Sequence, residues 1–192
     1  MGSNPTPSAD MKKEKVFVAF LRGINVGGHK AVKMEDLRRV FASLGFTSVK
    51  TLLNSGNVVF AASGSAGSLE KTIAAKLEAE YGYAINVMVR SMDSLAALEK
   101  ADPFAGIKMT PDTRLYVTFL GSPAKSKLKI PYVSDEGDFR IVVVTDGEIC
   151  SALQLSPKRG TVDVISFIEK EFGKQVTTRN WNTVARLLKT EV

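Results

Sequence analysis

The feature that most constrains this chain is the apolar run VFVAFL at residues 16–21, which leads directly into the glycine-rich segment LRGINVGGHK. Short, continuous apolar runs rich in β-forming residues are typical of a central strand. Glycine takes positive φ without strain, so the glycines that follow predict a tight turn from this strand into a helix. The first regular elements are therefore a central strand and a polar, glycine-rich loop.

Helical spacing and short β-rich runs alternate in the order β-α-β-β-α-β, which predicts a ferredoxin-like, or split β-α-β, fold. The second and third strands are joined by Asn54-Ser55-Gly56-Asn57, and asparagine and glycine favour a hairpin turn at this point. We expect Ser68 to cap the second helix, since serine accepts hydrogen bonds from free helix N–H groups. The expected strands are 16–21, 49–53, 58–61 and 85–89, and the expected helices are 34–44 and 69–81.

A short helix that Ser91 caps leads from this part into a second part, which mixes strands with two further helices. We therefore expect an α+β protein with a ferredoxin-like half at 15–108 and a smaller α+β half at 109–192. Residues 1–14 are polar and are expected to be a disordered tail or a cloning remnant. In the second half the expected strands are 114–120, 130–133, 139–144, 148–153 and 176–178, and the helices are 164–172 and one that Asn180 caps.

Residue counts exclude several kinds of chemistry. The chain has a single cysteine, Cys150, and a single histidine, His29, so one chain cannot build a Cys/His zinc site. Cys150 lies in an expected strand, which indicates a buried structural thiol rather than a nucleophile. No apolar run is long enough to span a membrane, and no secretory signal is present. These features predict a protein of a reducing, cytoplasmic compartment.

The net charge of +6 permits an anionic partner such as a nucleotide, a phosphorylated metabolite or a nucleic acid. The chain has no block of like charges that could act as a nucleic-acid-binding arm. Phe17, Phe20 and Phe60 fall on expected strands but do not follow the RNA-recognition pattern, so we expect them in the core. A nucleic-acid partner is therefore kept as an alternative.

The glycine-rich segment matches neither of the two common phosphate-binding loops. Gly23, Gly27 and Gly28 do not give the G-x-G-x-x-G spacing of dinucleotide-binding proteins. His29 and Lys30 stand where a P-loop requires Lys and Ser or Thr, which excludes ATP hydrolysis of that type. Two interpretations stay open: a turn that glycine makes possible, and a loop that binds a ligand.

The ferredoxin-like topology brings distant loops together. The loop after the first strand, at 22–30, and the hairpin at 54–57 should lie on the same edge of the sheet. The turn at Gly82-Tyr83 should lie on that edge as well. Such an edge collects backbone N–H groups, amide groups and basic side chains at the start of a helix, which suits an anion or another polar ligand.

Several segments together carry a family resemblance. They are FVAFLRGINVGG at 17–28, VKMEDL at 32–37, LGF at 44–46, SGN at 55–57 and TTRNWNTV at 177–184. With these segments the chain resembles the bacterial family called Domain of Unknown Function 1697, from about Lys15 to the C-terminus. The resemblance implies a cytoplasmic α+β protein with a ferredoxin-like N-terminal half. It implies no established reaction and no catalytic residues.

We expect a protein that binds a small anionic or nucleotide-like ligand between the 22–30 loop and the 54–57 hairpin. Both an enzyme and a pure binding protein fit this expectation. Basic side chains would supply positive charge, glycines would let the backbone approach, and asparagines would orient polar groups. No metal or cofactor is expected. The alternatives are a nucleic-acid-binding protein and a protein-interaction or scaffold module. The predicted ligand-binding residues are Arg22, Asn25, Gly27, Gly28, His29, Lys30, Asn54, Ser55, Asn57, Arg179 and Asn182.

Overall fold

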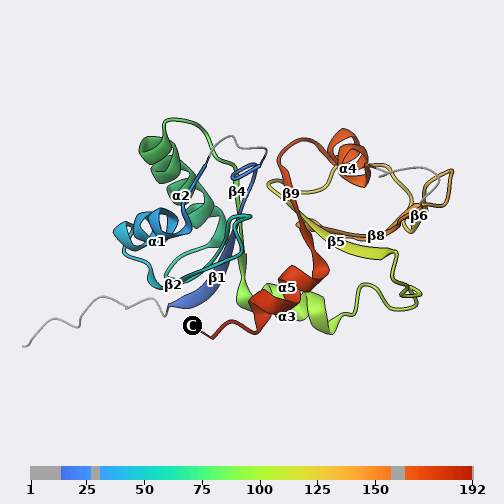
Figure 1. Ribbon diagram of the computed structural model, residues 1–192, viewed down its shortest axis with the longest axis horizontal. Helices are drawn as coiled ribbons and strands as arrows, with labels where there is room; N and C mark the ends of the chain where they lie inside the picture. Colours follow the sequence, from blue (N-terminus) through green and yellow to red (C-terminus); the bar gives the residue numbers. More distant parts are fainter. Residues whose placement is uncertain (1–13, 27–30, 157–162, 192) are drawn as a thin grey trace, which may run out of the picture.

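The computed structural model describes residues 14–26, 31–156 and 163–191. Two antiparallel sheets, each covered by helices, lie side by side (Figure 1). The α+β class that the sequence predicts is therefore confirmed. In these three segments no helix combines the length and the apolar character that crossing a membrane requires.

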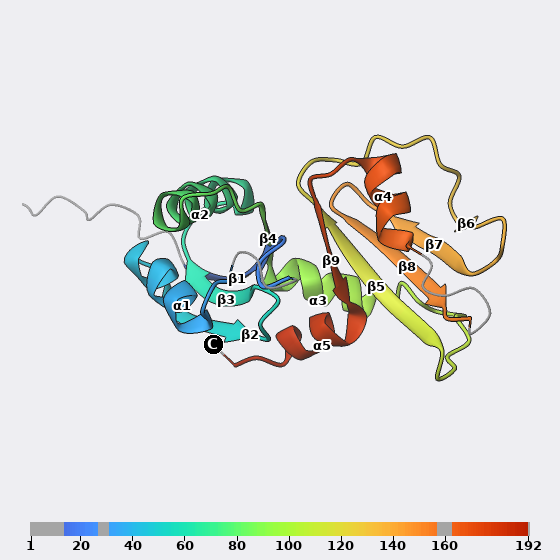
Figure 2. The same ribbon diagram turned by 45° about the horizontal axis from the view of Figure 1, so that its top comes forward.

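The first sheet has the strand order β2-β3-β1-β4, and each neighbouring pair is antiparallel. Helices α1 and α2 cover one of its faces (Figure 2). The elements follow one another as β-α-β-β-α-β, which is the order that the sequence predicts. Their bounds are β1 Lys15–Leu21, α1 Met34–Ser43, β2 Thr47–Leu52, β3 Asn57–Ala62, α2 Ala66–Tyr81 and β4 Val87–Ser91.

Strand β1 is apolar throughout because both of its faces are buried. Phe17, Ala19 and Leu21 belong to the core beneath α1 and α2. Val18 and Phe20 point to the opposite face, where they pack against the second sheet. Successive side chains of a strand alternate between faces, so a strand between two cores needs an unbroken apolar sequence. The expectation that Phe17, Phe20 and Phe60 are core residues is confirmed, since each is at most 2% exposed.

The second sheet has the strand order β6-β7-β8-β5-β9, and it is antiparallel as well. Helix α4 packs on one face through Val164 and Ile168. The other face meets the first sheet across a shared core, where the rings of Phe20 and Phe119 stack 3.9 Å apart. The bounds are β5 Thr113–Leu120, β6 Tyr132–Val133, β7 Phe139–Val144, β8 Glu148–Gln154, α4 Val164–Phe172 and β9 Val176–Asn180.

Helices α3 (Met92–Lys100) and α5 (Trp181–Leu188) lie together between the two sheets (Figures 1 and 2). Leu95 of α3 and Leu187 of α5 belong to the core that the sheets share. One core therefore joins the two parts of the chain, with helices from both parts in it.

Several local expectations are wrong in detail. Strand β2 begins at Thr47 rather than at 49, and β6 begins at Tyr132 rather than at 130. The cap of α2 is Ser65 rather than Ser68, because Ser68 donates its backbone N–H to Ser65 Oγ at 3.3 Å. Strand β4 begins at Val87, two residues after the expected start, and continues to Ser91. Strand β9 continues past Thr178 to Asn180. The last difference places Arg179 within a strand, so its side chain has a fixed direction relative to the first sheet.

Candidate functional site

The loop after β1 and the β2–β3 hairpin lie against each other, as the sequence predicts. The backbone N–H of Leu21 donates to the carbonyl oxygen of Gly56 at 2.8 Å. Asn25 Nδ2 donates to the carbonyl oxygen of Asn54 at 2.9 Å. The start of β4 joins the same edge, because Arg22 donates its N–H to the carbonyl of Asn86. We call this surface, formed by residues 21–26 and 53–57, the loop edge.

Gly56 is the residue that allows this close approach. Its φ is +77°, in the left-handed region that favours glycine. A Cβ atom at this position would stand 2.8 Å from both Ile24 Cδ1 and Leu21 Cβ. No larger residue fits without moving the loop, so the SGN segment is explained by packing of the hairpin against β1.

Asn25 closes the glycine-rich loop at its base. Its Oδ1 atom accepts the backbone N–H of Val32 at 2.7 Å, and its Nδ2 atom donates to the carbonyl of Val32 at 2.9 Å. Asn25 itself has φ +56°, a conformation that asparagine tolerates better than most residues. Four predicted ligand-binding residues, Gly27, Gly28, His29 and Lys30, lie in the loop that Asn25 closes and are outside the described residues.

The loop edge also carries an exposed residue with an unusual backbone. Leu53 has φ +60°, which is costly for a leucine, and 43% of its surface is exposed. Val26, across the Asn25–Asn54 hydrogen bond, is 67% exposed. Asn54 and Ser55 are exposed at the tip of the hairpin. The edge therefore presents apolar and polar groups to the solvent together.

Arg179 reaches this edge from β9, beneath its surface. The side chain is buried, and its donors meet Asn57 Oδ1 at 2.6 Å and the carbonyls of Leu21 and Ser55 at 2.7 and 2.9 Å. The remaining donors bind Thr177 Oγ1 and the carbonyl of Thr178. All five N–H groups of the guanidinium are thus used.

The positive charge of Arg179 has no carboxylate beside it among the described residues. Burial alone lowers the pKa of this side chain to about 10, since a low-dielectric surrounding disfavours the charged form. Asn57 is likewise buried, and its Nδ2 atom donates to the carbonyl of Leu52 at 2.9 Å. The structure thus brings Arg179 and Asn57 to the loop edge but places both of them in its interior.

Of the predicted residues, Arg22 contacts the second half of the chain, and Asn182 lies on the surface of α5. Arg22 Nη2 forms an ion pair with Glu169 of α4 at 2.7 Å, and Nη1 donates to the carbonyls of Lys174 and Val176. Asn182 is exposed on α5, and no hydrogen bond to its side chain is found in the described part of the chain. Arg22 therefore spans the two sheets, whereas Asn182 does not join the loop edge through any described contact.

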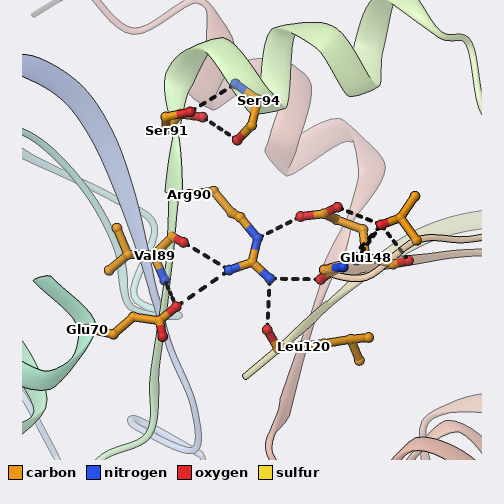
Figure 3. A network of polar contacts seen from close by, with 9 residues as sticks. Glu70, Val89, Arg90, Ser91, Ser94, Leu120 and Glu148 are labelled. Atoms are coloured by element: carbon orange, nitrogen blue, oxygen red, sulfur yellow. Dashed lines mark hydrogen bonds and ion pairs between the residues drawn. The ribbon is translucent and has the colours of Figure 1, made fainter. Parts of the chain in front are cut away.

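A second cluster, which no sequence pattern predicts, is centred on Arg90 of β4 (Figure 3). Arg90 Nε binds Glu148 Oε1 at 2.6 Å, and Nη1 lies 3.5 Å from Glu70 Oε1. Nη2 donates to the carbonyls of Leu120 and Gly147, both at 2.8 Å. Isolated Glu and Arg residues far apart in sequence look like ordinary surface charges, so only the packing of β4 against the second sheet reveals this cluster.

Cys150 is buried on β8, as the sequence predicts. Burial raises the pKa of its thiol to about 12, with a smaller contribution from the nearby charge of Glu148. A neutral, enclosed thiol is a poor nucleophile. In the described residues, moreover, no three His, Cys, Asp or Glu side chains group closely enough to hold a metal ion.

Comparison with known proteins supports the family resemblance. The model of the family "Protein of unknown function (DUF1697)" matches residues 15–149. The chain belongs to this family. The matched part of this DUF1697 protein contains both sides of the loop edge, Arg90 and Glu70, whereas Arg179 and the TTRNWNTV segment follow it.

A solved structure has the same fold as this DUF1697 protein. It is the conserved bacterial protein SP0830 from Streptococcus pneumoniae, with a TM-score of 0.65 and 20% sequence identity. The match covers 92% of this chain and 98% of the other. At this identity the likeness concerns the fold alone. Among the curated proteins searched, none matches significantly.

Proposed function

We propose that this protein binds a small anionic, nucleotide-like ligand at the loop edge, between the 22–30 loop and the 54–57 hairpin. The observation that carries the proposal is the charge of Arg179. It lies directly beneath the edge, hydrogen-bonded to neutral acceptors only. A buried charge is weakly screened, so it favours an anion at the surface above it.

In this proposal the predicted residues take two kinds of role. Arg179, Asn57 and Asn25 act as positioning residues, because their polar groups are already bonded within the protein. Asn54 and Ser55 are exposed and can meet the ligand. His29 and Lys30, which lie outside the described residues, are proposed as ligand-binding residues from the sequence alone. The strained backbone at Leu53 supports a functional edge, since strain is often retained where it serves binding.

The exposed apolar side chains favour a ligand that is more than a simple anion. Val26 and Leu53, the chain neighbours of the hydrogen-bonded Asn25 and Asn54, offer exposed apolar surface. A nucleobase or another flat ring could cover them while a phosphate group lies over the positive charge. This combination supports a nucleotide-like molecule rather than a free phosphate ion.

We also propose how the chain is divided and in which compartment the protein lies. We infer a ferredoxin-like first half at 15–108 and a second half at 109–192, which the element order and the strand order β2-β3-β1-β4 support. We also infer a bacterial, cytoplasmic protein, which the DUF1697 membership and the single buried cysteine support.

Calorimetric titration with AMP, adenosine and inorganic phosphate tests the proposal. AMP is expected to bind, and adenosine, which lacks the phosphate, is expected to bind at least about tenfold more weakly, or about 1.4 kcal/mol. An Asn54→Asp variant adds a negative charge at the tip of the hairpin and should weaken AMP binding about fivefold. Ala75→Glu adds the same charge on the exposed face of α2 and is the matched control.

The outcomes separate the proposal from its alternatives. Equal binding of AMP by the two variants, or no binding of AMP and phosphate by the unaltered protein, would reject a ligand at the loop edge. Binding of single-stranded RNA that falls steeply with salt, without binding of AMP, would favour the nucleic-acid alternative. Self-association in light scattering, again without AMP binding, would favour the interaction module.

A further inference from the structure

A cleft of about 520 Å³ opens between the two sheets near the start of β1. Residues 64–67, where α2 begins, form one wall, and residues 120–123 with the turn at 146–147 form another. Lys15 and Phe17 of β1 line the cleft, whereas the loop edge begins at Leu21, the last residue of that strand. The cleft is therefore separate from the proposed ligand site, and ligand pockets often lie between two such halves of a protein.

Glu70 of α2 presents a free carboxylate oxygen in this cleft. Its Oε1 atom accepts the backbone N–H of Val89 at 2.8 Å and lies 3.5 Å from Arg90 Nη1 (Figure 3). Its other oxygen, Oε2, has no hydrogen-bond partner in the segments that the structure describes. The side chain is 22% exposed, so this oxygen is reachable from the cleft but poorly hydrated.

Arg90 compensates the charge of Glu70 only in part. Its short contact, at 2.6 Å, is with Glu148 on the second sheet. Its other donors are used by the carbonyls of Val89, Leu120 and Gly147. Burial raises the pKa of Glu70 in spite of the hydrogen bond from Val89 and the nearby charge of Arg90, which both act to lower it. The carboxylate therefore lacks a full counter-charge.

The remaining charged side chains around the cleft leave a small excess of negative charge. Asp146 lies on the far wall, and Glu148 stands behind Arg90. Lys15 opposes them from the start of β1, where it has no ion pair with a described carboxylate. These three carboxylates outnumber the two cations, Lys15 and Arg90. Apolar residues also line the cleft. Phe17, Val89 and Leu120 are buried there, so Ala66 and Pro123 offer the apolar surface that can receive a carbon skeleton.

We propose that this cleft binds a small molecule with a primary amine, whose ammonium group donates a hydrogen bond to Glu70 Oε2. An ammonium group is compact, carries three donors and supplies the missing counter-charge. Charge-assisted hydrogen bonds of this kind are stronger than neutral ones, particularly where water is partly excluded. The hydroxyl groups of Ser65 and Ser91, which cap the helices at the rim, offer further acceptors for the same ammonium group.

NMR titration of the full chain with n-butylamine and n-butanol tests this assignment. The two probes share a carbon skeleton and differ in the charged amine. We expect n-butylamine to shift the amide signals of Gly67, Val89 and Arg90, with an apparent Kd at least about tenfold lower than that of n-butanol. Equal affinities, or shifts that occur away from the cleft, would overturn the proposal.

Two variants locate the binding group. Glu70→Gln keeps an oxygen for the N–H of Val89 but removes the charge, and it should weaken n-butylamine binding at least about tenfold. Glu78→Gln removes the same charge from an exposed position of the same helix and should bind like the unaltered protein. If Glu70→Gln does not fold, Gly67→Leu replaces it as the test, because a Cβ at Gly67 meets no atom within 4 Å. Unchanged binding in Glu70→Gln, or in Gly67→Leu where it stands in, contradicts the proposal.

Discussion

Arg22 and Arg179 cross between the two sheets in opposite directions. Arg179 of β9 donates to the carbonyl of Leu21, the last residue of β1, at 2.7 Å. Arg22, the residue that follows Leu21, donates to the carbonyl of Val176, the first residue of β9, at 3.1 Å. The segments that contain Arg22 and Arg179, which carry the family resemblance in the sequence, therefore contact each other directly. These two hydrogen bonds join the first sheet to the second.

Removing Arg179 should destabilise the protein strongly. Arg179→Ala leaves the carbonyls of Leu21 and Ser55 and the amide oxygen of Asn57 without a donor. Unsatisfied buried acceptors cost about 1–3 kcal/mol each, so the free energy of unfolding should fall by at least about 3 kcal/mol. Urea denaturation measures this change. Arg186→Ala, at an exposed position of α5, should change it by less than about 0.5 kcal/mol.

Gly56→Ala should cost more than the same change at Gly45. Both glycines have φ near +80°, so both variants incur backbone strain of about 1–2 kcal/mol. Only at Gly56 does the new Cβ atom meet other atoms, and overpacking adds about 1–3 kcal/mol. Thermal unfolding of the two variants gives the comparison. Equal losses would show that the hairpin is free to move away from Ile24.

The thiol of Cys150 should be inert in the folded protein. It is buried, and its pKa is raised to about 12 from an ordinary value of 9.0. An aromatic disulfide reagent near neutral pH should therefore react with one thiol per chain only after unfolding in guanidinium. Because the unfolded thiol ionises first, Cys150 should also make the fold less stable as the pH rises above 9.0. Cys150→Ala should remove this part of the pH dependence, and rapid reaction of the native protein would contradict the structure.

Glu70 should stabilise the fold more in acid than at neutral pH. Burial raises its pKa above the ordinary value of 4.5, so the folded protein binds its proton more tightly than the unfolded chain does. The free energy of unfolding, taken relative to Glu70→Gln, should rise as the pH falls through the raised pKa and level off below 4.5. Lys15, Arg90 and Asp146 line the same cleft in both proteins, and Glu148 pairs with Arg90 in both. A difference that stays constant over this range would show that Glu70 is not desolvated.

The local patterns of the sequence predict much of the fold. The unbroken apolar run of β1 predicts a strand with no solvent-facing side, and the structure places a core on each face. The hairpin chemistry of Asn54-Ser55-Gly56-Asn57 predicts that the second and third strands pair, and the antiparallel pairing of β2 with β3 confirms it. These inferences succeed because periodicity and turn residues act over a few positions.

Contacts between distant segments lie beyond such reasoning. Arg179 follows a short β-branched run that predicts a strand only as far as Thr178, and the extension to Asn180 depends on pairing with Tyr116. The cluster of Glu70, Arg90 and Glu148 forms because β4 packs on the second sheet. No property of these three residues in the sequence distinguishes them from surface charges. Whether the loop edge binds the proposed ligand stays a prediction.

The core that the two sheets share can be completed only late in synthesis, because it contains residues from both ends of the chain. Val184 and Leu187 of α5 cover the same apolar surface as Val18 and Phe20, which leave the ribosome far earlier. Until translation reaches these last residues, the part of the shared core that α5 completes remains uncovered, and exposed apolar surface of this kind promotes aggregation. A ribosome that stalls before Arg179 would therefore hold a nascent chain with exposed apolar surface on its first sheet, which is the kind of surface that chaperones bind.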